Sequence, residues 1–94
     1  VKVAGDVDRA STLIAERHPQ VVFVDLAAGP LAAPAAVTKL RAQAGEDVPF
    51  VAFGSHVDAD ALAAARDAGC REVMPRSKFT MQLPDLIRRY LAAD

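Results

Sequence analysis

The sequence predicts an α/β fold in which a parallel sheet carries helices on both faces. Two continuous apolar runs, at residues 21–26 and 48–53, have the composition of strands that are covered on both sides. Segments with helical spacing separate these runs, so the elements alternate in the order β-α-β-α-β-α-β-α. Such alternation is typical of a parallel sheet, because each helix returns the chain to the same end of the sheet.

The first half of the chain predicts two strands and two helices. Residues 1–4 alternate weakly and form a candidate short strand. Residues 8–17 repeat apolar side chains at helical spacing, and the helix is expected to stop at His18, because a residue before proline avoids the helical region. The apolar strand at 21–26 follows. Pro34 suits the first turn of a helix that is expected to continue to Ala44.

The second half begins with the strand at residues 48–53. Asp58 or Asp60 is expected to cap a helix that runs to Ala68, and Gly69 is expected to end it in the left-handed conformation.

A short strand is expected at residues 73–74, before the last helix. Thr80 is expected to cap this helix, with Pro84 in its first turn. Leu86 and Tyr90 belong to an apolar stripe that indicates which side of the helix is buried.

Length and composition narrow the functional classes. The 94 residues, of which 52% are hydrophobic, are expected to form one domain over residues 1–94. The net charge of -1 gives no electrostatic reason to expect binding to nucleic acid or to a membrane surface. No apolar run approaches the ~20 residues of a membrane span, and no secretory signal is visible. The single cysteine, Cys70, fits a reducing compartment, so a cytoplasmic location is expected.

Polar residues collect where the predicted strands end. Asp25 closes the first long strand, Ser55 and His56 follow the second, and Arg76 and Lys78 follow the third. The carboxyl ends of parallel strands meet at one edge of a sheet, where binding sites collect. An acid, a hydroxyl and a base at that edge indicate a phosphorylation pocket or its remnant.

Each of these residues has two interpretations. Asp25 is either a nucleophile that forms an aspartyl phosphate or an acid that caps the next loop. Arg76 and Lys78, which point to one side if the strand continues, either neutralise a phosphate or are solvated loop residues. Ser55 is a candidate phosphoryl contact, whereas His56 is more typical of a surface loop.

Four stretches of the chain resemble the receiver domain of bacterial response regulators. VKVAGDVDRASTLIAERHPQ, at residues 1–20, looks like the family's second strand and second helix. The stretch HPQVVFVDL, at residues 18–26, is similar to the family's third strand with its phospho-accepting aspartate. VPFVAFGSHVD, at 48–58, and AARDAGCREVMPRSKF, at 64–79, are similar to its fourth strand, fourth helix and fifth strand. The resemblance runs over the whole chain and implies a flavodoxin-like fold, a three-layer sandwich with a parallel sheet. It also implies that Asp25 is the phospho-acceptor and that Asp25 is one of the ligands of a Mg²⁺ ion.

The chain departs from the receiver pattern at the positions that carry the activity. The family's first strand and first helix, which include an acidic pair for Mg²⁺, have no counterpart, so residues 1–94 are expected to be incomplete at the N-terminus. Gly54 stands at the family's Thr or Ser position, which leaves only Ser55, one step on, to replace that hydroxyl. Arg76 stands at the Lys position, Ser77 at the Pro that follows it, and Val73 at the aromatic switch position.

These departures predict a degenerate receiver-like domain in phosphorelay signal transduction, which acts as a conformational or protein-interaction module. The alternatives are an active receiver, phosphorylated on Asp25 by a histidine kinase, and a purely structural dimerisation domain. No enzymatic activity beyond phospho-acceptance and self-dephosphorylation is expected. A histidine kinase or a downstream signalling protein is the expected partner. Only a weak homodimer is expected, because Leu62 is the one large apolar residue of the penultimate helix.

The missing strand has a structural consequence. Receiver sheets have the strand order 2-1-3-4-5, so the absent strand would lie between residues 1–4 and residues 21–26. Its absence leaves the apolar edge of 21–26 bare, without Pro or Lys to protect it. The chain is therefore not expected to fold alone as an ordinary monomer. Either a segment precedes Val1, or another chain supplies a strand, or the sheet is re-ordered.

Overall fold

The computed structural model describes residues 7–27 and 33–91, and within them it shows an α/β fold. The described part contains four helices and three strands, in the alternating order that the sequence predicts. The strand expected at residues 1–4 lies outside the described residues. The elements are α1 (Val7–Arg17), β1 (Val22–Asp25), α2 (Pro34–Ala44), β2 (Phe50–Gly54), α3 (Ala59–Asp67), β3 (Glu72–Pro75) and α4 (Arg76–Leu91).

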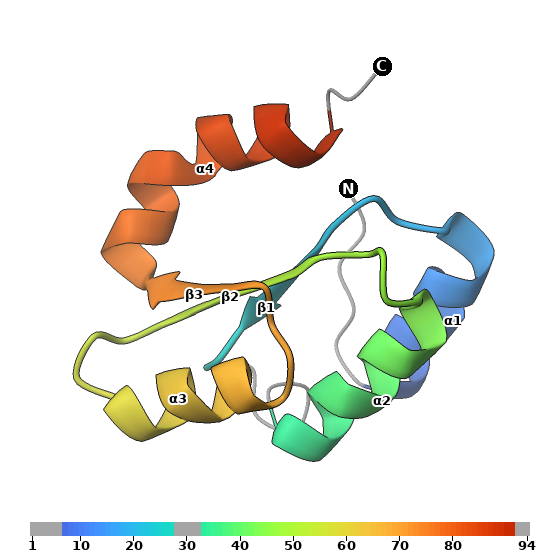
Figure 1. Cartoon of the computed structure of the whole chain (residues 1–94), viewed down its shortest axis with the longest axis horizontal. Coiled ribbons are helices and arrows are strands. Elements are labelled where there is room, and N and C mark those ends of the chain that lie inside the picture. Colours follow the sequence, from blue (N-terminus) through green and yellow to red (C-terminus); the bar gives the residue numbers. More distant parts are fainter. Residues whose placement is uncertain (1–6, 28–32, 92–94) are drawn as a thin grey trace.

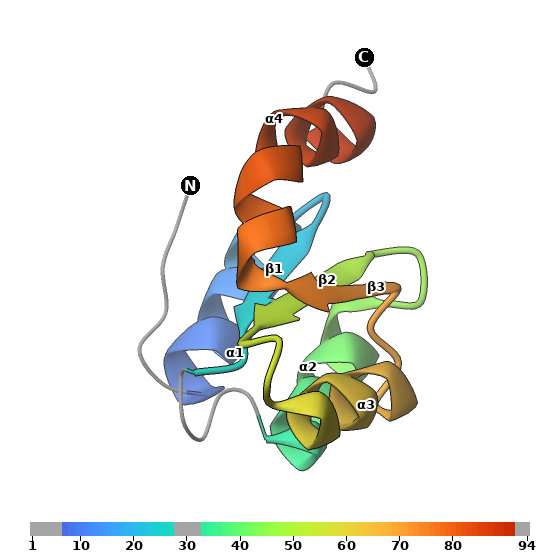
Figure 2. The ribbon, with the colours of Figure 1, turned by 90° about the vertical axis from the view of Figure 1, so that its left-hand side faces the viewer.

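The three described strands form one parallel sheet in the order β1-β2-β3, with β2 in the centre (Figure 2). Phe23 of β1 lies opposite Val51 of β2, and Phe53 of β2 lies opposite Met74 of β3. Among the described residues β1 pairs on one side only, so its outer edge is not covered by another described strand. The carboxyl ends of all three strands point the same way and bring Asp25, Gly54 and the start of α4 to one edge.

Helices cover both faces of the sheet (Figure 1). Successive side chains of a strand point to opposite faces, and the strands have apolar residues on both, so each face needs a covering of helices. On one face, α1, α2 and α3 pack against alternate residues of the strands. The core on this face includes Ile14, Val24, Val37, Leu40, Phe50, Ala52 and Ala65. On the other face, α4 packs against the intervening residues, and the core there consists of Val51, Met74 and Leu86, with partly buried aromatic residues around them.

Local sequence signals set several helix ends as predicted. The carboxylate of Asp58 accepts a hydrogen bond from the Ala61 N–H at 3.2 Å and caps α3. Pro34 begins α2, where its missing N–H costs nothing. Gly69 follows α3 with φ +104°, the left-handed conformation expected of it.

The last helix differs from its prediction at its start. We expected Thr80 to cap it and Pro84 to lie in its first turn, but α4 begins at Arg76, directly after the last residue of β3. Thr80 lies within the helix, where its hydroxyl donates to the Arg76 carbonyl at 3.1 Å. Pro84 lies in the interior, and α4 changes direction part-way along its length (Figure 1). A proline inside a helix removes one backbone hydrogen bond and favours such a bend.

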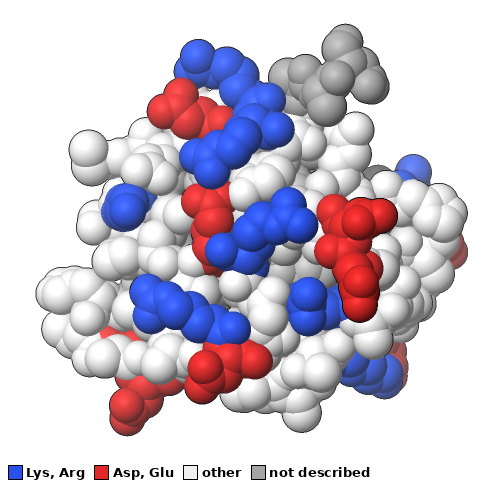
Figure 3. Space-filling model, in the orientation of Figure 1, with Lys and Arg blue, Asp and Glu red and all other residues white. Residues whose placement is uncertain are grey.

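The surface carries no large patch of one charge on the face seen in Figure 3. Basic and acidic side chains alternate over this face. No helix in the described part of the chain is long and apolar enough to cross a membrane.

Candidate functional site

The site is built around Asp25 and Arg76, which come from opposite edges of the described sheet. Asp25 is the last residue of β1, and Arg76 is the first residue of α4, immediately after β3. The Arg76 Nη2 lies 2.6 Å from the Asp25 Oδ1, and Nη1 lies 3.4 Å from Oδ2. The guanidinium therefore faces both carboxylate oxygens and reaches across the end of β2. Both side chains keep over two fifths of their surface exposed, so the pair is open to solvent.

The same carboxylate also fixes the turn that follows β1. The Ala27 N–H donates to the Asp25 Oδ1 at 3.0 Å. The hydrogen bond from Arg76 is the main reason that the pKa of Asp25 lies below its ordinary value of 3.8. Burial raises this pKa by less than Arg76 lowers it, and the Ala27 N–H lowers it by a smaller amount again. Asp25 is thus an ionised carboxylate at neutral pH. The structure confirms that it caps the next loop, and its role as a nucleophile stays a prediction.

Arg76 has a second partner beside the carboxylate. Its guanidinium carbon lies 5.0 Å from the centre of the Phe53 ring, within the range of a cation–π interaction. The planar guanidinium of arginine can pair with a carboxylate and lie over an aromatic ring at the same time, whereas the ammonium group of lysine cannot. Arginine at this position is therefore not a simple replacement for lysine.

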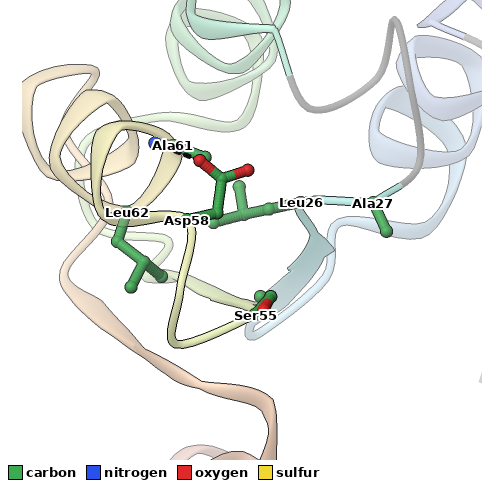
Figure 4. Close-up of a pocket in the computed structure, with 7 residues that line it drawn as sticks. Leu26, Ala27, Ser55, Asp58, Ala61 and Leu62 are labelled. Carbon is green, nitrogen blue, oxygen red and sulfur yellow. Dashed lines mark hydrogen bonds between the residues drawn. The ribbon is translucent and has the colours of Figure 1, made fainter.

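Ser55 lies in the exposed loop after β2, where its hydroxyl is turned towards its own loop. The Ser55 Oγ accepts the Val57 N–H at 3.4 Å. Ser55 also lines a hollow of about 70 Å³ between the end of β1 and the start of α3, space for no more than a few water molecules (Figure 4). Leu26, Ala27, Gly54, Asp58, Ala61 and Leu62 complete its lining. Asp25 and Arg76 do not line this hollow.

The structure supplies a reason for glycine at position 54. A Cβ atom on Gly54 would lie 3.0 Å from the Cβ of Leu26 and 3.2 Å from its Cδ1. The first of these atoms is fixed to the backbone of the segment after β1 and cannot rotate away. A serine or threonine at position 54, as in the receiver pattern, would therefore force the ends of β1 and β2 apart.

Lys78 does not join the pair in the way the sequence suggested. We expected Arg76 and Lys78 to point to one side if β3 continued, but the chain is helical from Arg76 onwards. Residues two apart on a helix are turned by about 200° from one another. Lys78 is an exposed residue of the first turns of α4, and His56 is exposed in the loop after β2.

Among the residues that the structure describes, the donor groups near Asp25 do not fit a Mg²⁺ site. Mg²⁺ requires several oxygen ligands, whereas Asp25 is a single carboxylate that already faces a guanidinium. Asp58, which lines the neighbouring hollow, is the cap of α3. The part of the chain that the structure describes holds no group of three or more His, Cys, Asp or Glu residues placed to bind a metal ion.

Sequence reasoning missed the aromatic cluster (Phe23, Phe53 and Phe79) that lies beneath Arg76. The Phe53 and Phe79 rings stack with their centres 3.9 Å apart and their planes 9° from parallel. Phe79 meets Phe23 edge-on, with ring centres 5.4 Å apart. The alternation of the strands places Phe23 and Phe53 on one face, and this signal was available, but Phe79 falls on that face only because α4 begins at Arg76.

Comparisons with models of known protein families, with curated proteins and with solved structures found no match for this chain.

Proposed function

We propose that this chain is a degenerate receiver-like domain of phosphorelay signalling, with the three layers of a flavodoxin-like sandwich. In this proposal it acts as a conformational or protein-interaction module, and Asp25 is its central residue. One observation carries the proposal: Asp25, at the end of β1, forms an ion pair with Arg76, directly after β3. These are the two positions at which the receiver family has its phospho-accepting aspartate and its lysine.

Two observations support a degenerate rather than an active receiver. A Cβ at position 54 would crowd Leu26, so the hydroxyl residue that contacts a phosphoryl group in the receiver pattern fits there only if the neighbouring atoms shift. The Asp25 carboxylate is engaged by a guanidinium and lacks neighbouring acids among the described residues that would hold Mg²⁺ beside it. Phosphoryl transfer depends mainly on positioning and charge neutralisation. A domain without the hydroxyl contact and without a bound Mg²⁺ ion is therefore expected to transfer a phosphoryl group poorly.

The active receiver stays as the second candidate, because Asp25 has two properties of a nucleophile. It is ionised at neutral pH, and its side chain is 41% exposed to solvent. In that case a histidine kinase would be the phosphodonor and Arg76 would move from the carboxylate to the phosphoryl oxygens. In either case the proposed location is the cytoplasm, which fits the unpaired and buried Cys70.

A purely structural dimerisation domain has less support. Leu62 is only 8% exposed, so the one large apolar residue of α3 belongs to the interior rather than to an interface. The outer surface of α3 is then formed by small and charged side chains, which offer little apolar area to a second copy.

Incubation with a small-molecule phosphodonor and Mg²⁺ tests the proposal, with the intact mass of the protein as the readout. We expect no stable addition of a phosphoryl group under conditions that label an active receiver completely. Asp25→Asn is the matched control, since it keeps the shape of the side chain and removes the nucleophile. Stoichiometric labelling that needs Mg²⁺ and disappears in Asp25→Asn would establish the active receiver instead.

A further inference from the structure

The two halves of α4 are held to the sheet by different contacts. The first segment (residues 76–83) contacts the ends of β1 and β2 through Arg76 and Phe79. The second segment (residues 85–91) contacts β3 through Glu72, which accepts hydrogen bonds from Arg89, at 2.9 Å, and from the Tyr90 hydroxyl. Leu86, which is completely buried, belongs to the second segment. Pro84 stands between the segments and interrupts the hydrogen-bond ladder of the helix.

The contacts of the first segment form a continuous path from Asp25. The Asp25 carboxylate holds the Arg76 guanidinium, and that guanidinium lies over the Phe53 ring. Phe53 stacks on Phe79, which is three residues beyond Arg76 on the same side of the helix. The path therefore begins at the proposed signalling residue and ends in the first turns of α4.

Few other contacts hold the first segment in place. Met81, which lies in it, is 82% exposed. Ser77, Lys78 and Thr80 are also exposed, whereas Gln82 and Leu83 are half-buried. Phe79 is the residue of this segment that packs against the buried core on this face of the sheet. A segment with few buried apolar contacts opens locally at little cost in free energy.

We propose that the charge of Asp25 controls how firmly the first segment of α4 is held, while the second segment stays fixed to β3. Loss of the negative charge, or its redirection to a bound partner, releases Arg76 from the carboxylate. The guanidinium then no longer covers Phe53, on which Phe79 stacks, and the first segment loosens up to Pro84. This inference rests on the proposed function and extends it. A change in the charge of Asp25 alters how firmly α4 is held, and no phosphorylation is needed.

Hydrogen exchange of the full chain, resolved along α4, tests the inference. In Asp25→Asn we expect the amides of residues 79–83, which have hydrogen-bond acceptors within the helix, to exchange about two- to fivefold faster than in the wild type, the range that loss of an exposed ion pair supports. Exchange in residues 85–91 should not change. Asp58→Asn is the matched control, because it alters a carboxylate at the same edge of the sheet that caps α3 and does not contact Arg76.

Tyr90 provides an independent check on the second segment. It is the only tyrosine and the chain has no tryptophan, so its fluorescence reports on this one position. A carboxylate that accepts the phenol hydrogen quenches tyrosine emission, and Glu72 plays this part here. We expect the emission to be the same in the wild type and in Asp25→Asn, and to rise in Glu72→Ala.

A double substitution shows whether the path runs through Phe79. In Phe79→Leu the helix keeps an apolar side chain but loses the stack on Phe53, so adding Asp25→Asn should accelerate exchange by less than it does in the wild type. Equal acceleration in both backgrounds, a uniform change along the whole of α4, or an effect of Asp58→Asn as large as that of Asp25→Asn would overturn the inference. Since no phosphodonor is used, these results are independent of whether Asp25 can be labelled.

Discussion

At the scale of single residues, Asp25 combines a local and a long-range role. Its Oδ1 accepts the Ala27 N–H in the next loop, and the same atom accepts the Arg76 guanidinium from the far side of the sheet. Local sequence was enough to predict an acid at this edge, because the apolar strand before it is unmistakable. The partner at 2.6 Å was less predictable, since Arg76 reaches it only from the start of a helix whose first residue the sequence placed later.

The pH dependence of stability should follow the Asp25 pKa. The pKa is lowered in the folded state, chiefly by the hydrogen bond from Arg76, so the pair stabilises the fold above the ordinary carboxyl pKa. This contribution is lost as the pH falls through the folded-state pKa. Denaturant unfolding at a series of pH values should show a loss of about 0.2–1 kcal/mol on acidification that Asp25→Asn lacks, a range set by the exposure of the pair. Identical pH profiles for the two proteins would contradict this account of the pair.

Position 54 should reject the hydroxyl residue of the receiver pattern. Gly54→Thr is expected to lower the free energy of unfolding by about 1–3 kcal/mol, because the new Cβ would lie 3.0 Å from the Leu26 Cβ. Ser55→Thr is the matched control, since it adds a methyl group one residue later at an exposed position, and it should be nearly neutral. If Gly54→Thr is as stable as the wild type, the ends of β1 and β2 are less tightly packed than described here.

At the scale of elements, the sequence predicted best where a local signal decides the outcome. Pro34 and Asp58 mark helix starts, and Gly69 marks a helix end, through backbone chemistry that needs no distant partner. Thr80 and Pro84 also have the properties of residues at a helix start, but the start that they predicted was wrong, because α4 begins at Arg76. Burial of Phe79 and Leu86 against the sheet extends α4 back to β3, which is a tertiary effect that no local pattern contains.

Two glycines with positive φ offer a test of how helix ends are packed. Gly69 and Gly45 have φ of +104° and +99°, so alanine at either position should cost about 1–2 kcal/mol of backbone strain. A Cβ at Gly69 would in addition lie 2.3 Å from an Arg41 guanidinium nitrogen, whereas nothing lies within 4 Å at Gly45. Thermal unfolding should therefore show a larger loss for Gly69→Ala than for Gly45→Ala. The excess should shrink in an Arg41→Ala background, and an excess that persists there would show that Arg41 is not its cause.

At the scale of the whole molecule, the open edge of β1 is the feature with the widest consequence. Val22 and Leu26 donate their N–H groups to β2, so the N–H groups of Phe23 and Asp25 point to the opposite edge. No described strand pairs with that edge. The expectation that residues 1–4 lie beyond a missing strand falls outside the described residues and stays a prediction.

The outer edge of β1, which no described strand covers, predicts self-association of this chain. Sedimentation at increasing concentration should show a weight-average mass that rises above that of the monomer, because the edge carries neither Pro nor Lys. Gln20→Lys places a positive charge at an exposed position two residues before β1 and should reduce the association. A mass that stays at the monomer value over the whole concentration range would show that the edge is satisfied within one chain.

We propose that the Arg76 guanidinium, rather than a Mg²⁺ ion, neutralises the Asp25 carboxylate. The most direct measurement is an NMR titration of the Asp25 carboxyl carbon, with and without Mg²⁺ and in the wild type and Arg76→Gln. We predict a titration midpoint below the ordinary value of 3.8 in the wild type, no response to Mg²⁺ at neutral pH, and a midpoint that rises in Arg76→Gln. A midpoint that Arg76→Gln leaves unchanged, together with a carboxyl signal that shifts and saturates with Mg²⁺, would contradict the account.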